Sequence, residues 1–415
     1  MTDTMTGPLT STVTPPIDHL SLPFFDDMHQ HLGQQLAAWV LHQHIDEADD
    51  RRACREWVQR LGSDGWLRYC VPSGEGGAWG GALPTLDSRA LVVLRETLAF
   101  HSPLADFAFA MQGLGSGAIT LAGTPTQQAA YLPAVARGDK IAAFALSEAE
   151  AGSDVGAMRT RAQACLGGWA MNGSKTWISN GGIADFYVTF AKTEPEAGTR
   201  GITAFIVDAD TAGLDSSQHI EVMAPHPLAT LVFNQCQLPT DCQLGTLNGG
   251  FKLAMQTLDI FRASVAGAAL GMARRALAEA LHFVKQRAMF GQHLADFQLT
   301  QAKLGEMAAL VDAAALLTYR AAWLRDEGER THLASGTTIS VQARLAQTVA
   351  AAMAKMTATE NAQRVIDMAL QMHGGHGVKV GTKVESLYRD IRSLRIYEGA
   401  TEVQQLIIGK AVLQP

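Results

Sequence analysis

The segment Ile141-Ala-Ala-Phe-Ala-Leu-Ser-Glu-Ala-Glu-Ala-Gly-Ser-Asp154 marks the point at which the pattern of apolar residues changes. Before it, residues 24–137 carry Ala and Leu at helical spacing, with Gly and Pro between the segments. After it, short β-branched and aromatic segments bounded by Gly, Asn and Asp predict strands. From about residue 250 the helical period returns, and Leu258 and Val265 stand at heptad spacing, which is typical of a helical bundle.

This order of helices, strands and helices predicts an α+β fold. The chain has 415 residues, of which 47% are hydrophobic, so it can form several cores and is not disordered throughout. We expect a loose N-terminal tail over residues 1–22, an N-terminal helical domain over 23–140, a middle β domain over 141–246 and a C-terminal helical bundle over 247–415.

The charge lies mostly in the first 50 residues. They contain eight acidic residues and no Lys or Arg, whereas the whole chain has a net charge of −7. The rest is therefore nearly neutral, which does not favour a nucleic-acid-binding protein. Five scattered Cys without a CxxC motif are typical of a reducing compartment. Since no long uninterrupted apolar run and no signal or transit peptide is recognisable, we expect a cytoplasmic protein that does not enter a membrane.

Two segments of the β domain carry polar groups that could face a ligand. In residues 144–154, Gly152 permits close backbone approach, and Ser147 and Ser153 offer hydroxyl groups. The segment could equally bind only its own backbone. In residues 172–182, Trp177 stands among small polar residues, as a planar ring ligand would require, or it is a tryptophan at the rim of a barrel.

Three segments of the helical region are also candidates. Arg287 could pair with a phosphate group or with a helix dipole. The glycines of residues 371–378 could expose backbone N–H groups, whereas His373 and His376 lack a third ligand nearby, so we expect no metal site. Glu398 lies in a short break between two apolar helices, where burial would raise the pKa of its carboxyl toward that of a useful base. A carboxylate favoured by the next helix N-terminus is the alternative.

Taken together, these segments resemble the acyl-CoA dehydrogenase family of flavoproteins. The resemblance begins near Val71-Pro72 and is carried by FALSEAEAGSD (144–154), KTWISNG (175–181), LDIFR (258–262), RAMFGQ (287–292), QMHGGHG (371–377) and IYEGATEVQ (396–404). It implies an N-terminal α-helical domain, a middle β-barrel, a C-terminal four-helix bundle and an FAD cofactor. The residues that it implies for FAD are Phe144, Leu146, Ser147, Gly152, Ser153, Trp177, Ile178, Ser179, Arg287, Phe290, Phe297, Gln298, Gln371, Gly374, Gly375, Thr401 and Glu402.

The resemblance also implies a reaction. Glu398 matches the family's catalytic base, which removes the α-proton of an acyl-CoA thioester while the β-hydride passes to flavin N5, giving a trans-2-enoyl thioester. Some members carry the base just before Arg262, where this chain has Phe261. The implied substrate-binding residues are Ser153, Asp259, Arg262, Tyr397 and Gly399.

The family pattern further implies a homo-oligomer, typically a tetramer built as a dimer of dimers, in which a neighbouring subunit completes the FAD site. Electron-transfer flavoprotein is the expected acceptor. A flavin oxidase, an acyl-carrier-protein thioester dehydrogenase, and a desulfinase- or monooxygenase-like relative are alternatives on the same fold. Phe107, Phe109 and Met111 suggest an apolar acyl pocket, but the sequence does not identify the acyl group of the substrate. The chain departs from the pattern at Ala149 and Ala400, and a long loop is expected near Arg325–Gly336.

Overall fold

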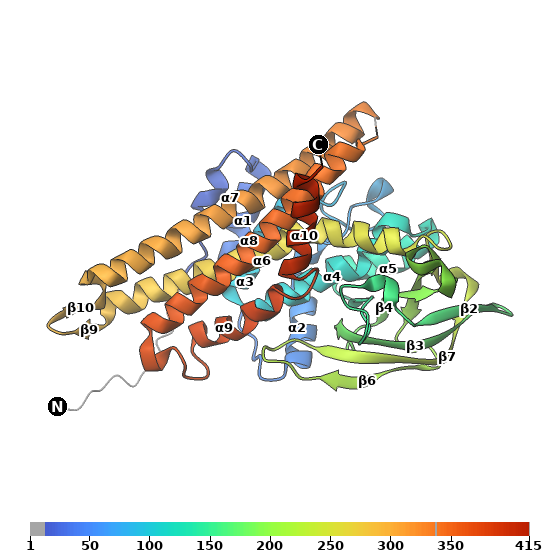
Figure 1. The fold of residues 1–415 in the computed structure, drawn as a ribbon, viewed down its shortest axis with the longest axis horizontal. Helices are drawn as coiled ribbons and strands as arrows, with labels where there is room; N and C mark the ends of the chain where they lie inside the picture. Colours follow the sequence, from blue (N-terminus) through green and yellow to red (C-terminus); the bar gives the residue numbers. More distant parts are fainter. Residues whose placement is uncertain (1–12, 337, 415) are drawn as a thin grey trace.

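The computed structural model describes residues 13–336 and 338–414 and contains three regions (Figure 1). The first is helical, because Ala- and Leu-rich segments follow strong N-caps: Asp49, Asp87, Ser102 and Thr124 each accept a hydrogen bond from a first-turn backbone N–H. Its helices are α1 (Asp27–Val40), α2 (Asp50–Ser63), α3 (Ser88–His101), α4 (Pro103–Ala122) and α5 (Pro125–Arg137).

The second region is an eight-stranded sheet with the order β6-β7-β3-β2-β4-β5-β8, in which β1 pairs in parallel with β4. Strand β6 carries mostly exposed polar residues at the edge of the sheet, which is why the sequence pattern does not reveal it. The strands are β1 (Ala142–Ala145), β2 (Arg161–Cys165), β3 (Gly168–Ser179), β4 (Phe186–Lys192), β5 (Ile202–Asp208), β6 (Leu214–Ile220), β7 (Leu228–Pro239) and β8 (Gln243–Leu244).

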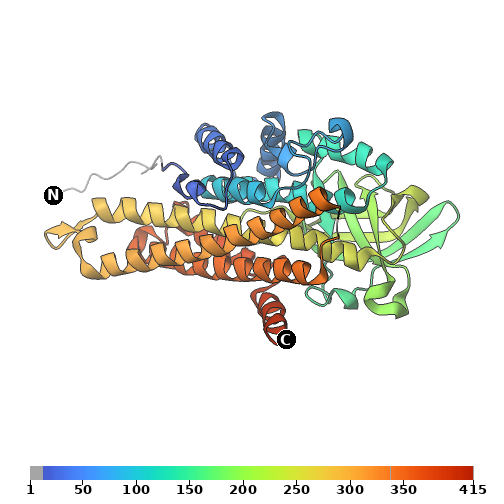
Figure 2. The ribbon, with the colours of Figure 1, turned by 90° about the horizontal axis from the view of Figure 1, so that it is seen from above.

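The third region is a bundle of long helices that extends away from the sheet (Figure 2). Helices α6, α7, α8 and α9 pack on one another, α3 packs on α6, and α10 contacts α8. The elements are α6 (Gly250–Gln286), β9 (Ala288–Met289), β10 (Gln292–His293), α7 (Gln298–Ser335), α8 (Val341–Met372), α9 (Lys383–Leu394) and α10 (Thr401–Val412). The α+β fold class and its three-part order are thus confirmed.

Three glycines of α4 bring the three regions into close contact. A Cβ at Gly113 would lie 2.7 Å from the ring of Phe261 on α6, and a Cβ at Gly115 would lie 2.6 Å from Ala142 of β1. Gly117 also lies against Phe261. The helix therefore approaches both the sheet and the bundle at distances that larger residues would not allow.

Two expectations about chain segments are wrong. The long loop expected near Arg325–Gly336 is helical, because α7 continues to Ser335. Within this part of α7, Asp326 accepts hydrogen bonds from the backbone N–H groups of Ser88 and Arg89. The loose tail does not reach residue 22, since Leu20 is buried and the ring of His19 stacks on that of Tyr319. Residues 1–12 of that tail lie outside the described residues.

By length and composition alone, α7 contains a window apolar enough to cross a bilayer, and 44% of that window is buried. Packing of α7 against α6 and α8 accounts for this apolar character equally well, because the core helix of a bundle meets the same criterion.

Candidate active site

Glu398 lies in the loop between α9 and α10, and the backbone of this loop is left-handed. The φ angle is 52° at Glu398 and 92° at Gly399. A non-glycine residue with such a φ is uncommon and persists only where surrounding contacts hold it. Here the carbonyl oxygen of Gly399 accepts hydrogen bonds from Lys355 Nζ at 2.7 Å and from Gln404 Nε2 at 2.9 Å.

A second set of contacts joins both sides of this loop to α8. Glu360 on α8 accepts hydrogen bonds from Arg395 Nε at 2.8 Å and from the hydroxyl of Thr401 at 2.7 Å. Arg395 precedes the loop and Thr401 begins α10, so one carboxylate fixes the two ends. Of the residues assigned to FAD, Thr401 is therefore buried in a structural contact, while Glu402 is exposed.

Glu398 is half-buried, and one oxygen of its carboxyl group, Oε2, is itself buried and lacks a hydrogen-bond partner among the described residues. Burial raises the pKa of Glu398, and the charges of Arg95, Lys355 and Arg262 oppose that rise. A carboxylate with a raised pKa and a free oxygen is suited to accept a proton.

Among these three cations, Arg95 opposes the rise in the pKa of Glu398 most strongly. It is 2% exposed and binds Asp106 through two hydrogen bonds, of 2.7 Å from Nε and 2.9 Å from Nη2. Its third contact goes to Ser264 Oγ at 3.0 Å. Tyr397 lies within electrostatic reach of Arg95, and burial raises the pKa of its hydroxyl. Tyr397 therefore remains neutral beside the carboxyl of Glu398.

Asp259 and Arg262 form an ion pair one turn apart on α6. It is not a surface pair, because Arg262 is buried and its Nε has no hydrogen-bond partner among the described residues. Arg262 of α6 lies within electrostatic reach of Glu398, so the structure brings it near the loop that carries Tyr397, Glu398 and Gly399. Ser153, the remaining residue assigned to the substrate, is exposed in the β domain.

The segment after β1 is held by a buried ion pair that the sequence analysis did not identify. Lys175 Nζ lies 2.8 Å from Glu148 Oε1 and 3.0 Å from the carbonyl oxygen of Leu146. The carboxylate of Glu148 also accepts hydrogen bonds from the backbone N–H groups of Arg159 and Thr160, at 2.6 and 3.0 Å. The sequence signal that could have revealed this ion pair is Lys175 itself, a charged residue at a position of β3 whose side chain faces inward.

Trp177 lies at an irregular point of β3, where the register with β7 shifts between Lys175 and Ile178. Its φ is 60°, and 58% of its large aromatic side chain is exposed. The side chains of Leu146 and Ile178 point into the core, so only their backbone groups are available, whereas Phe144, Ser147 and Ser179 are partly exposed. An exposed aromatic ring beside open polar backbone fits the ring system of FAD.

The remaining residues assigned to FAD lie at the opposite end of the bundle. Helix α6 starts against β5, where a Cβ at Gly250 would lie 2.7 Å from Thr203, and has 37 residues, which corresponds to about 55 Å. Arg287 follows its last residue, and Phe283 in its last turn stacks on His373. Arg287, Phe290, Gln298, Gln371, Gly374 and Gly375 are exposed at this end, and Phe297 is half-buried.

The glycines of these loops leave open space. A Cβ at Gly152, Gly374 or Gly375 would have no atom within 4 Å, so internal packing does not require glycine there. Open backbone of this kind suits close approach of a phosphate-bearing ligand. His373, in contrast, is engaged, because its Nδ1 lies 2.7 Å from the carbonyl oxygen of Ala369, as expected for a histidine at a helix end.

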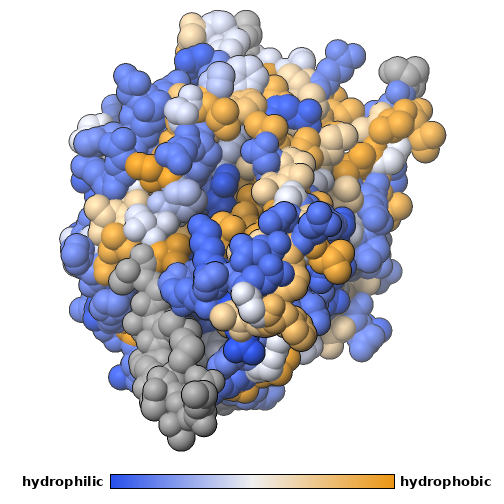
Figure 3. Space-filling model, turned by 90° about the vertical axis from the view of Figure 1, so that its left-hand side faces the viewer, coloured by the Kyte–Doolittle hydropathy of each residue, from blue (hydrophilic) through white to orange (hydrophobic). Residues whose placement is uncertain are grey.

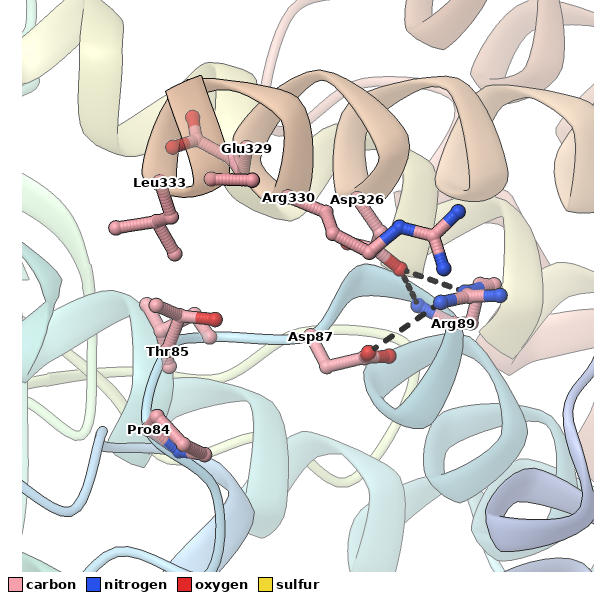
Figure 4. A pocket seen from close by; sticks show the side chains of 10 residues that line it. Pro84, Thr85, Asp87, Arg89, Asp326, Glu329, Arg330 and Leu333 are labelled. Carbon is pink, nitrogen blue, oxygen red and sulfur yellow. Dashed lines mark hydrogen bonds and ion pairs between the residues drawn. The ribbon is translucent and has the colours of Figure 1, made fainter. Parts of the chain in front are cut away.

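A cavity of about 490 Å³ lies away from all of these residues (Figure 4). It opens between residues 84–89 and the last turns of α7, and an ion pair between Arg89 and Asp326, with Nε and Oδ2 3.0 Å apart, lies at its edge. Arg89 and Asp326 bind one another there, and none of the residues assigned to the substrate or to FAD lines this cavity.

Comparisons with known proteins agree with the three-part organisation of the chain. The models for the N-terminal, middle and C-terminal domains of acyl-CoA dehydrogenase match residues 27–139, 143–236 and 248–413. A 3-(aryl)acrylate reductase of Clostridium sporogenes is 36% identical over 94% of this chain and 100% of its own length. Subunit CarC of the caffeyl-CoA reductase–Etf complex of Acetobacterium woodii is 35% identical over 87% of this chain and 90% of its own.

Among solved structures, an acyl-CoA dehydrogenase complexed with FAD from Bacillus anthracis has a TM-score of 0.84 and is 28% identical, covering 97% of this chain and 69% of that one. The residues present also fit FAD, as the exposed Trp177 and the open glycine loops show. The chain therefore belongs to the acyl-CoA dehydrogenase family and is a flavin-dependent oxidoreductase with FAD as its cofactor.

Proposed function

We propose that this enzyme removes the α-proton and β-hydrogen of an acyl-CoA thioester, giving the trans-2-enoyl thioester, with Glu398 as the α-proton base. The buried, unpartnered Oε2 of Glu398 carries this proposal. Bound FAD supplies the acceptor for the β-hydride. The proton goes to Glu398, so that two electrons and two hydrogens leave the substrate.

A thioester α-proton is too weakly acidic for an ordinary carboxylate, so the site must stabilise negative charge at the thioester oxygen. Within the described residues, no backbone hydrogen bond engages the N–H of Glu398 itself. We propose that this N–H donates to the thioester oxygen. Enclosure of the site strengthens that hydrogen bond and keeps the pKa of the Glu398 carboxyl raised.

The two relatives compared above are named as reductases, which favours a second candidate. In it, the same residues work in the reverse direction: protonated Glu398 donates a proton to the α-carbon of a 2-enoyl or arylacrylyl thioester, and FAD in its reduced form would supply the hydride to the β-carbon. Phe107, Phe109 and Met111 are all buried, and Phe107 stacks on His226 with ring centroids 4.6 Å apart. Phe107 and Met111 stand four residues apart on α4 and therefore share one face of this helix, whereas Phe109 lies on the opposite side. An apolar face of this kind suits an apolar or aromatic acyl group.

We propose that two subunits complete each FAD site, in a tetramer built as a dimer of dimers. About 55 Å of helix separates Arg287 from the start of α6, so one chain does not bring both groups of residues to one cofactor. The far end of the bundle, seen in Figure 3, carries exposed apolar side chains, including Phe290, Leu299, Val378 and Val380. These would be covered by a neighbouring subunit. Electron-transfer flavoprotein is the proposed acceptor.

The test uses the FAD-loaded enzyme under anaerobic conditions. A panel of acyl-CoA thioesters with linear, branched and aryl-substituted chains is added, and flavin absorbance is followed. Bleaching by at least one thioester is expected, and Glu398→Gln should retain FAD but bleach at least about a hundredfold more slowly. Unchanged bleaching by the variant would contradict the proposed base.

The alternatives give different results in the same assay. Rapid peroxide formation with air as the acceptor would indicate an oxidase, and bleaching by acyl-carrier-protein thioesters alone would indicate a carrier-bound substrate. Reoxidation of the dithionite-reduced enzyme by a cinnamoyl-CoA thioester, faster than bleaching by any saturated thioester, would favour the reductive direction.

A further inference from the structure

The contact between Lys355 and the Glu398 loop is unusual, because it places a buried ammonium group against a carbonyl oxygen. Lys355 lies on α8 and is completely buried, and its Nζ donates to the Gly399 carbonyl at 2.7 Å. No carboxylate lies within ion-pair distance of this Nζ among the described residues. A buried charge without a carboxylate partner is costly, and a functional reason is the usual explanation.

The other cations near Glu398 differ from Lys355 in this respect. Arg95 on α3 is paired with Asp106 of α4, and Arg262 on α6 is paired with Asp259. Each of these guanidinium groups binds a carboxylate of its own, although the charge of Arg95 still makes the largest contribution that opposes the rise in the pKa of Glu398. The further charged and titratable groups that face Lys355 and Glu398 are Glu360 of α8, Glu402 of α10 and Tyr397 of the loop. Glu360 is itself bound to Arg395.

We propose that Lys355 is a positioning residue for the base: its ammonium group fixes the left-handed turn through Gly399, and its unbalanced positive charge keeps the carboxylate of Glu398 ionised. The proposal rests on the assignment of Glu398 as base. It explains why α8 carries a lysine at a position packed among Ala352, Ala358 and Thr359, where an apolar residue would cost less.

The electrostatics agree with this geometry. Burial lowers the pKa of Lys355 to about 8, and the negative charge of Glu398 opposes that fall, so the lysine is mostly protonated at neutral pH. Burial raises the pKa of Glu398, and the charge of Lys355 counteracts the rise. Removal of the positive charge should therefore raise the pKa of Glu398 further and delay its ionisation to higher pH.

The experiment compares Lys355→Met, Lys355→Gln and Lys355→Arg with the wild-type enzyme. Lys303→Met, an exposed lysine on α7, is the matched control, and FAD content is measured for every variant. The first readout is the rate of anaerobic flavin bleaching as a function of pH. The second is an infrared titration of the protonated carboxyl band that is absent in Glu398→Gln, which reports on Glu398 without turnover.

For Lys355→Met and Lys355→Gln we expect both midpoints to move up by about one pH unit, so that bleaching well below the midpoint is about tenfold slower. Lys355→Arg and Lys303→Met should keep the wild-type midpoints. Lys355→Gln introduces a polar, uncharged side chain, so it tests the effect of removing the positive charge if Lys355→Met does not fold.

A lower rate with unchanged midpoints in the uncharged variants would overturn the proposal, because a merely structural role would lower the rate at every pH alike. A midpoint shift in Lys303→Met of equal size would also overturn it. If instead Glu398→Gln bleaches normally, the assignment of Glu398 as base fails, which is a result distinct from a failure of Lys355.

Discussion

The loop that carries Glu398 and the strand that carries Trp177 are built alike but stabilised differently. Each contains a non-glycine residue with a positive φ, of 52° at Glu398 and 60° at Trp177. Each involves a buried lysine: Lys355 of α8 binds the Glu398 loop, whereas Lys175, two residues before Trp177 on β3, binds the segment after β1. Lys175 has the carboxylate of Glu148 at 2.8 Å, whereas Lys355 has only a carbonyl oxygen.

The partners of the two lysines indicate different roles for Lys175 and Lys355. The charge of Lys175 is balanced locally by Glu148, so that it stabilises the segment that follows β1. The charge of Lys355 is not balanced locally, so that it acts on Glu398. We therefore expect substitutions at Lys175 to affect mainly stability and substitutions at Lys355 to affect mainly catalysis.

The largest effect on stability is expected for Lys175→Met. The substitution leaves the carboxylate of Glu148 buried without its cation, which costs about 3–5 kcal/mol of unfolding free energy. Lys355→Met removes a charged hydrogen bond without stranding a carboxylate and should cost about 1.5–3 kcal/mol. Urea denaturation at one fixed FAD concentration measures both values.

The control for Lys175→Met is its combination with Glu148→Gln. The neutral amide can still accept the backbone hydrogen bonds of Arg159 and Thr160, so the double variant should recover part of the lost stability. Equal costs for Lys175→Met and Lys355→Met would remove the distinction between the two lysines.

A smaller effect is expected for Trp177→Gly. Glycine adopts the positive φ without strain, which offsets much of the lost packing, so the unfolding free energy of the apoprotein should change by no more than about 1 kcal/mol. The dissociation constant for FAD should rise about three- to tenfold through loss of the aromatic contact. Fluorescence titration of the apoprotein with FAD measures this constant. An unchanged affinity would contradict a contact between the Trp177 ring and FAD.

The smallest effect is expected for Gly375→Ala at the far end of the bundle. The added methyl group meets no protein atom, so the unfolding free energy should change by less than about 0.5 kcal/mol. Affinity for FAD should nevertheless fall a few-fold, because the methyl group occupies the space in which the ligand approaches. Gly305→Ala, whose Cβ also enters open space, is the control and should leave FAD affinity unchanged.

Much of the fold follows from local sequence patterns. Caps such as Thr124 and the change of period near Ile141 locate helices and strands correctly. The expected loop near Arg325–Gly336 is wrong, because Asp326 is fixed by contacts with Ser88 and Arg89, which are distant in the sequence. The exposed edge strand β6 has no apolar alternation that could reveal it.

The motifs identified Glu398, Arg262 and Trp177 as candidates, but they did not reveal the residues that contact these segments. Lys355 and Lys175 become informative only when burial and partners are known, because a lysine in a helix or strand is ordinarily exposed. The same applies to Arg95 and Asp106, eleven residues apart on two helices. The distance between the two groups of FAD residues likewise emerges only from the length of α6.

The proposed base is tested most directly by exchange of the α-protons of phenylacetyl-CoA in deuterium oxide. This thioester has two α-protons but no hydrogen on its β-carbon, so proton removal is measured without oxidation. NMR should show that the FAD-loaded wild-type enzyme catalyses the exchange and that Glu398→Gln is slower by at least about a hundredfold. Equal exchange rates for the wild-type enzyme and Glu398→Gln would contradict the assignment of Glu398 as the base.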